Sequence, residues 1–120
     1  MQKKTVVLGA SQNEDRYSNM AVKKLTAHNH PVTAIGNKEG SINDVKIIKD
    51  NPAIESVDTV TLYLNPQNQK PYYDYVLSLN PKRIIFNPGT ENEELEKMAT
   101  EKGIKTMDAC TLVLLSTNQY

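Results

Sequence analysis

Short apolar segments alternate with longer amphipathic ones along the whole chain, and this alternation is the feature that most restricts the fold. The apolar segments are rich in β-branched residues and hydrophobic at consecutive positions, which is typical of strands buried on both faces of a parallel sheet. We predict five such strands, at residues 5–8, 32–35, 60–64, 83–86 and 105–107. A shorter segment at residues 45–48 predicts a further edge strand.

Between the strands, apolar residues recur every three or four positions, which indicates amphipathic helices. Ser18, Asn65 and Thr90 stand where N-caps are expected for the first three helices, and Glu93 completes a capping box with Thr90. A fourth helix is expected at residues 111–115. Alternating strands and helices with right-handed crossovers favour a parallel sheet. We therefore predict that the 120 residues form one α/β domain, a three-layer, Rossmann-like open parallel sheet with helices on both faces.

Charge and cysteine content exclude several classes of protein. The chain has 14 basic and 14 acidic residues, so it lacks the excess positive charge that draws proteins to nucleic acid or anionic lipid. The sequence shows no signal region and no apolar segment of the length that spans a bilayer. Cys110 is the single cysteine, which excludes an internal disulfide and favours a reducing compartment. We expect a cytoplasmic protein that binds neither nucleic acid nor membrane, and the sequence identifies no protein partner.

The loop after the first strand has the composition of a phosphate-binding loop. In an open parallel sheet the ligand lies beyond the carboxyl ends of the strands, where the strand order reverses. Gly9, Ala10 and Ser11 are small enough to let backbone amides approach an anion. Arg16 can hold phosphate oxygens, and a helix that starts at Ser18 points its positive end at the same place. The alternative is a tight strand-to-helix turn with solvated charges.

The end of the second strand carries Asn37 and Lys38. An NAD site normally has an acidic residue near this position to hold the ribose hydroxyls. An amide and an ammonium group instead suit a ribose that carries a phosphate, as in NADP and coenzyme A (CoA). The alternative is an exposed lysine on a polar loop. Asn65 and Pro66 follow the third predicted strand and start a helix that faces the same crevice.

The sequence offers few candidates for catalysis or metal binding. His28 and His30 lie around the end of the first helix, so we expect them at the edge of the sheet opposite the ligand. For Cys110 we expect packing, with a mixed disulfide to a CoA-like thiol as the alternative. No Cys/His cluster has the spacing of metal ligands. We predict a site with no catalytic residue and no metal.

Several of these segments resemble the small stand-alone CoA-binding proteins, a family similar to the CoA-binding domain of the succinyl-CoA synthetase α subunit. They are residues 6–11, residues 16–18, residues 87–92 and Cys110. The resemblance extends over essentially the whole chain and is most specific in the Gly-Ala-Ser loop and the Arg-Tyr-Ser that follows it. It implies a Rossmann-like, nucleotide-binding domain that holds the ADP portion of CoA across the strand ends.

The resemblance also implies which residues contact the ligand. Carried over residue by residue, it places Gly9, Ala10, Ser11, Arg16 and Ser18 at the phosphates of the ligand. It places Asn37 and Lys38 at the phosphorylated ribose, and Asn65 and Pro66 at the adenine. The chain departs from the family pattern at several positions, since many relatives have a proline in the first loop and Asn-Pro at the end of the second strand. Ala109 stands where many relatives have arginine, and the acidic Glu14 and Asp15 lie inside the expected phosphate loop, where a carboxylate opposes anion binding.

From the residues and the resemblance together, we predict non-catalytic binding of CoA or an acyl-CoA through the ADP portion. Two alternatives stay open. The first is an NADP-dependent or redox accessory domain that needs a partner to complete its substrate site. The second is a Rossmann-like interaction module that has lost its ligand.

Overall fold

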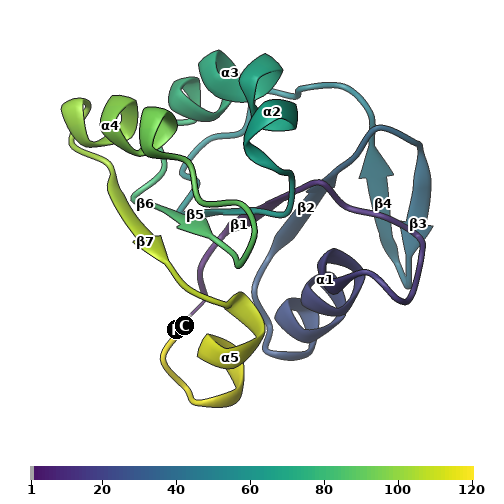
Figure 1. Ribbon diagram of the computed structural model, residues 1–120. Helices are drawn as coiled ribbons and strands as arrows, with labels where there is room; N and C mark the ends of the chain where they lie inside the picture. Colours follow the sequence, from purple (N-terminus) through teal and green to yellow (C-terminus); the bar gives the residue numbers. More distant parts are fainter. Residues whose placement is uncertain (1) are drawn as a thin grey trace.

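Seven strands form a single sheet in the computed structural model, which describes residues 2–120 (Figure 1). They are β1 (Thr5–Leu8), β2 (Val32–Ile35), β3 (Gly40–Ile42), β4 (Val45–Ile48), β5 (Thr59–Leu62), β6 (Arg83–Phe86) and β7 (Lys105–Asp108). Their order across the sheet is β3-β4-β2-β1-β5-β6-β7. All neighbouring strands are parallel except β3 and β4. After β1 the chain adds β2, β3 and β4 on one side and then β5, β6 and β7 on the other, so the strand order reverses between β1 and β5.

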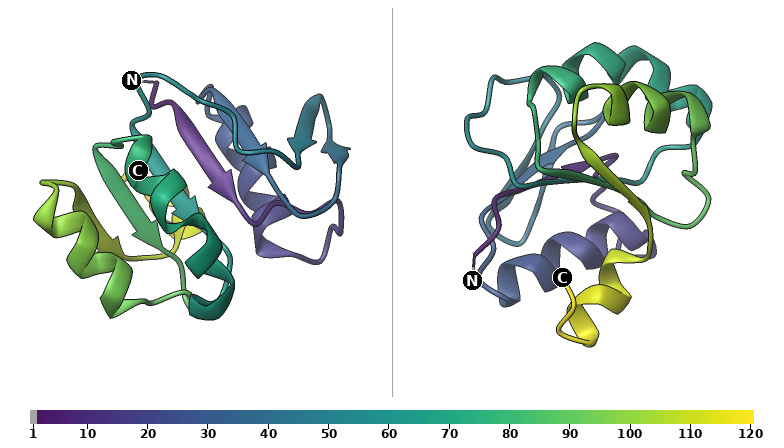
Figure 2. Two further views of the ribbon diagram at one scale, coloured as in Figure 1. Left: turned by 90° about the horizontal axis from the view of Figure 1, so that it is seen from above. Right: turned by 90° about the vertical axis from the view of Figure 1, so that its left-hand side faces the viewer.

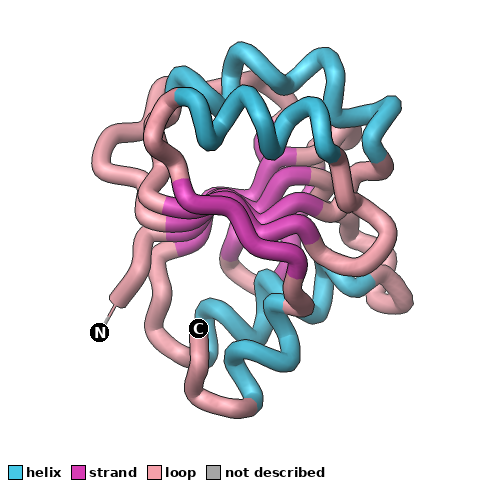
Figure 3. The backbone as a smooth tube through the Cα atoms, turned by 60° about the vertical axis from the view of Figure 1, so that its left-hand side comes forward, coloured by secondary structure: helices cyan, strands magenta, loops and turns pink. Residues whose placement is uncertain are grey.

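Helices cover both faces of the sheet, which confirms the predicted three-layer α/β, Rossmann-like fold (Figures 1 and 3). They are α1 (Tyr17–Ala27), α2 (Pro66–Gln69), the 3-10 helix η1 (Lys70–Tyr72), α3 (Tyr73–Ser78), α4 (Glu93–Glu101) and α5 (Thr111–Ser116). One face carries α1 and α5, and the other carries α2, α3 and α4.

Side chains of the central strand β1 alternate between two hydrophobic cores, as expected for a strand covered on both faces. Val6 and Leu8 lie in the core beneath α3 and α4, together with Leu95. Val7 lies in the opposite core with Leu25 of α1. All four residues of β1 are buried, which explains why Val6, Val7 and Leu8 are apolar at consecutive positions.

The prediction missed strand β3, which pairs antiparallel with β4 at the edge of the sheet beyond β2 (Figure 2). The segment begins with Gly40 and Ser41 and has one buried apolar side chain, Ile42, so it lacks the apolar pattern of the other strands. Asn43 makes the turn to β4 with a positive φ of 52°. The pairing partner, and not the intrinsic preference of the segment, makes it a strand.

The capping box predicted at Thr90 is wrong. Helix α4 starts at Glu93, and its N-cap is Asn92, whose Oδ1 accepts a hydrogen bond from the amide of Leu95 at 3.2 Å. The Thr90 hydroxyl instead donates to the carbonyl oxygen of Asn87 at 2.8 Å and closes the turn before the helix. Both Thr90 and Asn92 are residues that cap well, so the choice between them depended on the path of the loop.

Tyr120 lies at the amino edge of the sheet, where Thr5, Arg83 and His30 surround it. Its hydroxyl hydrogen bonds to Thr5 Oγ1, and Arg83 Nη2 donates to its carbonyl oxygen at 2.9 Å. The Arg83 guanidinium lies 4.4 Å from the centre of its ring, and the His30 ring lies 4.9 Å from it. His30 Nδ1 accepts the backbone amide hydrogen of Lys3 at 2.9 Å, which requires that this nitrogen be unprotonated.

This arrangement predicts that the protein loses stability as the pH falls below about 6.5. Burial lowers the pKa of His30 below its ordinary 6.5, and the charges of His28, Lys3 and Arg83 lower it further. The unfolded chain therefore takes up this proton more readily than the folded chain, and acid favours unfolding. We expect His30→Gln to have a shallower fall in melting temperature between pH 7 and pH 5. The exposed His28→Gln is the control, and an equal slope in both variants would contradict the assignment.

Candidate functional site

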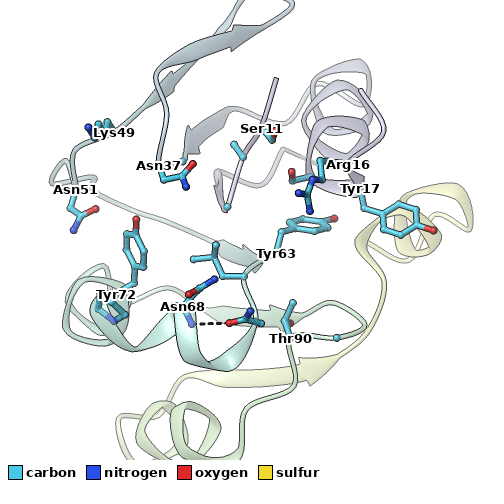
Figure 4. Close-up of a pocket in the computed structure, with 18 of the residues that line it drawn as sticks. Ser11, Arg16, Tyr17, Asn37, Lys49, Asn51, Tyr63, Asn68, Tyr72 and Thr90 are labelled. Carbon is cyan, nitrogen blue, oxygen red and sulfur yellow. Dashed lines mark hydrogen bonds between the residues drawn. The ribbon is translucent and has the colours of Figure 1, made fainter. Parts of the chain in front are cut away.

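A cavity of about 1170 Å³ lies at the carboxyl ends of the strands, on both sides of the point where the strand order reverses (Figure 4). This is the edge at which the sequence predicted a ligand. The loops after β1, β2, β4, β5 and β6 all contribute to its walls. The lining residues are 9–11, 15–18, 36–37, 49–51, 63–65, 68, 71–72 and 88–90.

The structure brings most of the predicted site residues together around this cavity. The predicted residues that line it are Gly9, Ala10, Ser11, Arg16, Ser18, Asn37 and Asn65. Lys38 and Pro66 are not among the lining residues. Lys38 is exposed in the turn between β2 and β3, and Pro66 begins α2 behind its N-cap Asn65. The N-cap prediction for Asn65 is confirmed, since its Oδ1 accepts from the amide of Asn68 at 2.8 Å.

Gly9 is required by packing rather than by an approach of its amide to an anion. The amides of Gly9 and Ala10 both donate to the carbonyl oxygen of Ile35, at 2.8 and 2.9 Å, so both are already used. Gly9 has a φ of +99°, and a Cβ at this position would lie 3.1 Å from the backbone of Tyr63 and from the side chain of Leu64. The missing side chain therefore lets the β1 and β5 loops, two walls of the cavity, lie against each other.

The first turn of α1 supplies the free amides that the sequence had assigned to Gly9 and Ala10. Helix α1 starts at Tyr17 with Arg16 at the N-cap, so the prediction of Ser18 as the cap is wrong. Arg16 offers no side-chain cap, and the first turn carries no acidic residue. Among the described residues, no acceptor takes the amides of Tyr17 and Ser18. Arg16, Tyr17 and Ser18 all line the cavity, so uncompensated N–H groups of an 11-residue helix face it.

Gly36 and Gln12 hold the β1 loop in place, and the sequence analysis recognised neither. A Cβ on Gly36 would lie 2.3 Å from the carbonyl oxygen of Ala10, so only glycine allows this contact between the β1 and β2 loops. Gln12 accepts a hydrogen bond from the amide of Ser41 at 3.0 Å and thereby links the loop to β3. The sequence signal for Gly36 was its position directly after a predicted strand.

Two cations and two carboxylates line the cavity. Arg16 comes from the N-terminus of α1 and Lys49 from the segment after β4, while the carboxylates belong to Asp15 and Asp50. The single ion pair among residues 2–120 lies elsewhere, between Lys23 and Glu14 at 3.4 Å. Glu14 thus has a cationic partner and does not line the cavity. Of the two neighbouring acidic residues Glu14 and Asp15, Asp15 is the one that lines it.

Gln69 connects two walls of the cavity from beneath. Its side chain is 1% exposed, and its Nε2 donates to the carbonyl oxygens of Leu64 and Thr90, both at 2.8 Å. Its Oε1 accepts from Asn92 Nδ2 at 2.9 Å. Leu64 and Thr90 line the cavity, so one buried amide sets the separation of the β5 and β6 loops. The sequence analysis missed this residue, since a glutamine within a polar helical turn gives no signal.

Tyr63 contributes an uncharged phenol to the floor of the cavity. Burial raises the pKa of Tyr63 to about 12, so the hydroxyl keeps its proton at neutral pH. The hydroxyl oxygen is buried without a hydrogen-bond partner among the described residues. Residues 2–120 contain no group of His, Cys, Asp and Glu side chains with the geometry of a metal site. Histidine and cysteine are absent from the lining, and His30 lies at the opposite edge of the sheet, as predicted.

Comparisons with known proteins identify the family and the fold of the chain. The sequence profile of the CoA binding domain family matches residues 3–116. A crystal structure of a protein described as uncharacterized is 51% identical, with a TM-score of 0.97 over 100% of this chain and 99% of that one. The fold is also similar to that of a protein from Thermus thermophilus, at 20% identity and a TM-score of 0.86 over 99% of this chain and 91% of that one.

A redesigned binding protein, Prb, has the same fold, at 18% identity and a TM-score of 0.86 over 98% of this chain and 84% of that one. No functionally curated protein matches the chain. Within residues 2–120, none of the helices has the length and apolar character needed to cross a membrane.

Proposed function

The chain belongs to the family of CoA-binding domains, and we propose that it binds CoA or an acyl-CoA through the ADP portion without transforming it. In this proposal the diphosphate lies against the N-terminus of α1. The adenine and ribose extend over the ends of the neighbouring strands, and the pantetheine arm leaves the cavity toward solvent.

The observation that carries the proposal is the uncapped N-terminus of α1 at the cavity. The amides of Tyr17 and Ser18 have no acceptor among the described residues, and the Arg16 side chain points into the same space (Figure 4). Unpaired amides, the positive end of a helix and a guanidinium together form an anion site. A diphosphate is the anionic part of CoA that matches two adjacent amides and a bidentate guanidinium.

The opposite wall suits an adenine ring. Leu64, Pro71 and Tyr72 present apolar surface, and Asn65 and Asn68 present amides beside it. A flat aromatic base can pack on the apolar groups while its ring nitrogens and amino group meet the amides. The expected role of Asn65 near the adenine thus agrees with its position, whereas Pro66 acts by starting α2.

A binding role is favoured over catalysis by the chemistry of the lining. Catalysis by a nucleophile needs a base within hydrogen-bond distance. The lining contains neither histidine nor cysteine, and no hydroxyl of the described residues hydrogen bonds to the carboxylate of Asp15 or Asp50. With its pKa raised to about 12, Tyr63 stays protonated at neutral pH and is not available as a base. Cys110 is half-buried at the start of α5 and outside the lining.

Thermal stability in the presence of ligands tests the proposal. A ligand at about a hundred times its dissociation constant adds roughly 2.7 kcal/mol to the free energy of unfolding. We expect CoA to raise the melting temperature more than ADP, NAD or NADP at equal concentration. A larger shift with NADP would favour the alternative of an NADP-dependent accessory domain. No shift with any of the four would favour a module without a nucleotide ligand.

The variant Arg16→Ala tests the position of the diphosphate. A charge-assisted hydrogen bond to phosphate contributes about 1.5–3 kcal/mol, so we expect CoA affinity to fall about ten- to a hundredfold in calorimetry. Lys97→Ala is the control, because it removes a positive charge from α4 outside the cavity. Equal affinities of the two variants would place the diphosphate elsewhere.

A further inference from the structure

We propose that Lys49 makes the site selective for nucleotides that carry a phosphate on the ribose, so that CoA binds more tightly than dephospho-CoA. The inference rests on the proposed function, since it concerns a second contact of the same ligand. It assigns to the segment after β4 the role that the sequence analysis expected of Lys38.

The cavity has two cationic ends, and neither cation is paired with a carboxylate among the described residues. Arg16 lies at the end formed by α1, and Lys49 lies across the cavity from it, with Asn37 between them in the view of Figure 4. One diphosphate accounts for the Arg16 end. A second, separate anionic group would match Lys49, and neither ADP nor NAD carries one on its ribose.

The order of the strands indicates where that second group lies. β2 is the parallel neighbour of β1, and β4 is the next parallel neighbour beyond β2. Parallel strands lie about 4.8 Å apart, so the ends of β1 and β4 are about 10 Å from each other. A nucleotide with its diphosphate beside β1 and its ribose over the end of β2 directs a ribose substituent toward the end of β4. Lys49 is the first residue after that strand.

Amide groups flank this end of the cavity. Asn37 follows β2, and Asn51 stands two residues after Lys49, and both line the cavity. No hydrogen bond to another described residue engages the side chain of Lys49, Asn37 or Asn51. An ammonium group together with amide N–H donors is a suitable set for one phosphate. The carboxylate of Asp50 also lines this end, so the charges of Lys49 and Asp50 offset each other at a distance. A phosphate bound here is therefore held by direct contacts with the Lys49 ammonium group and the side-chain amides.

Lys38 is a matched control that the chain itself provides. It is an exposed lysine close to the same strand ends, it has the same charge, and it does not line the cavity. The β3–β4 hairpin follows Lys38 and ends at Ile48, directly before Lys49. Two lysines that differ mainly in access to the cavity thus allow direct contact to be separated from general charge.

The experiment compares CoA with dephospho-CoA by calorimetry in the wild type, Lys49→Met and Lys38→Met. We expect the wild type to prefer CoA by about tenfold or more, since a contact of an ammonium with a partly shielded phosphate corresponds to about ten- to a hundredfold in affinity. Lys49→Met should lose this preference through weaker CoA binding, with dephospho-CoA unchanged. Lys38→Met should retain both affinities.

Two results would overturn the inference and leave the proposed function in place. One is a selective loss of CoA affinity in Lys38→Met, and the other is an equal loss for both ligands in Lys49→Met. Failure of the proposed function has a different signature, because the wild type would then bind neither CoA nor dephospho-CoA. Circular dichroism of the three proteins checks that each is folded at the temperature of the titration.

Discussion

Replacing Gly9 with valine is expected to lower the free energy of unfolding by about 3 kcal/mol and to weaken CoA binding at least tenfold. A β-branched residue at a φ of +99° is strained by roughly 1–3 kcal/mol, and a Cβ only 3.1 Å from the Tyr63 backbone adds a packing cost of similar size. The side chain pushes the β1 and β5 loops apart, and both loops line the cavity. Urea unfolding and calorimetry with CoA measure the two effects.

Gly103→Val is the matched control for this variant. Gly103 also has a positive φ, of 78°, and a Cβ there would meet no atom within 4 Å. It follows α4, away from the cavity. Gly103→Val should therefore show the backbone strain without the packing cost and bind CoA with wild-type affinity. If Gly9→Val proved no less stable than Gly103→Val and bound CoA equally well, the contact between the β1 and β5 loops would have no role in the site.

Gln69→Leu is expected to destabilise the protein by about 3 kcal/mol or more and also to weaken CoA binding. Leucine fills a similar volume but leaves the carbonyl oxygens of Leu64 and Thr90 and the amide of Asn92 without their buried partner. Each buried polar group left without a hydrogen bond costs about 1–3 kcal/mol. The β5 and β6 loops then lose the bridge that holds them, so the adenine side of the cavity should be the part that loosens.

Gln67→Leu provides the comparison on the same helical turn, because Gln67 is exposed and outside the cavity. We expect its stability to change by less than about 0.5 kcal/mol, as for most surface substitutions. Measuring adenosine-containing and adenine-free fragments of CoA separates the two consequences of Gln69→Leu. A loss of stability with unchanged affinity for every fragment would make Gln69 a purely structural residue.

Where the signal was local, the prediction from the sequence was accurate. β1, β2, β4 and β6 have the predicted bounds. For β1 and β6 the reason is a run of consecutive buried apolar residues, which is typical of a strand covered on both faces. The N-cap at Asn65 was also predictable, since a cap residue followed by proline specifies a helix start within two positions. The location of the cavity followed from topology, because parallel strands bring all their carboxyl ends to one edge.

Where two similar residues competed, the sequence did not decide between them. Thr90 and Asn92 both cap helices well, and the hydrogen bond from Thr90 to Asn87 left Asn92 as the cap of α4. Ser18 was a plausible cap for α1, but the N-cap is Arg16, two residues earlier, and Ser18 lies inside the helix. In each case the path of the preceding loop, which depends on distant contacts, selected the start of the helix.

The sequence by itself thus determined the layers, every strand except β3 and the edge at which a ligand is expected, because the burial of apolar periodic segments requires only local information. The tertiary structure decided which side chains line the cavity. Lys38 and Lys49 are equally polar and both follow strands, and the antiparallel hairpin β3–β4 brings Lys49 to the lining while Lys38 stays outside it. Gly36 and Gln69 likewise matter through contacts with residues distant in sequence, at Ala10 and at Thr90. Such contacts arise only when the chain has folded, since nothing in the local sequence specifies the distant partner.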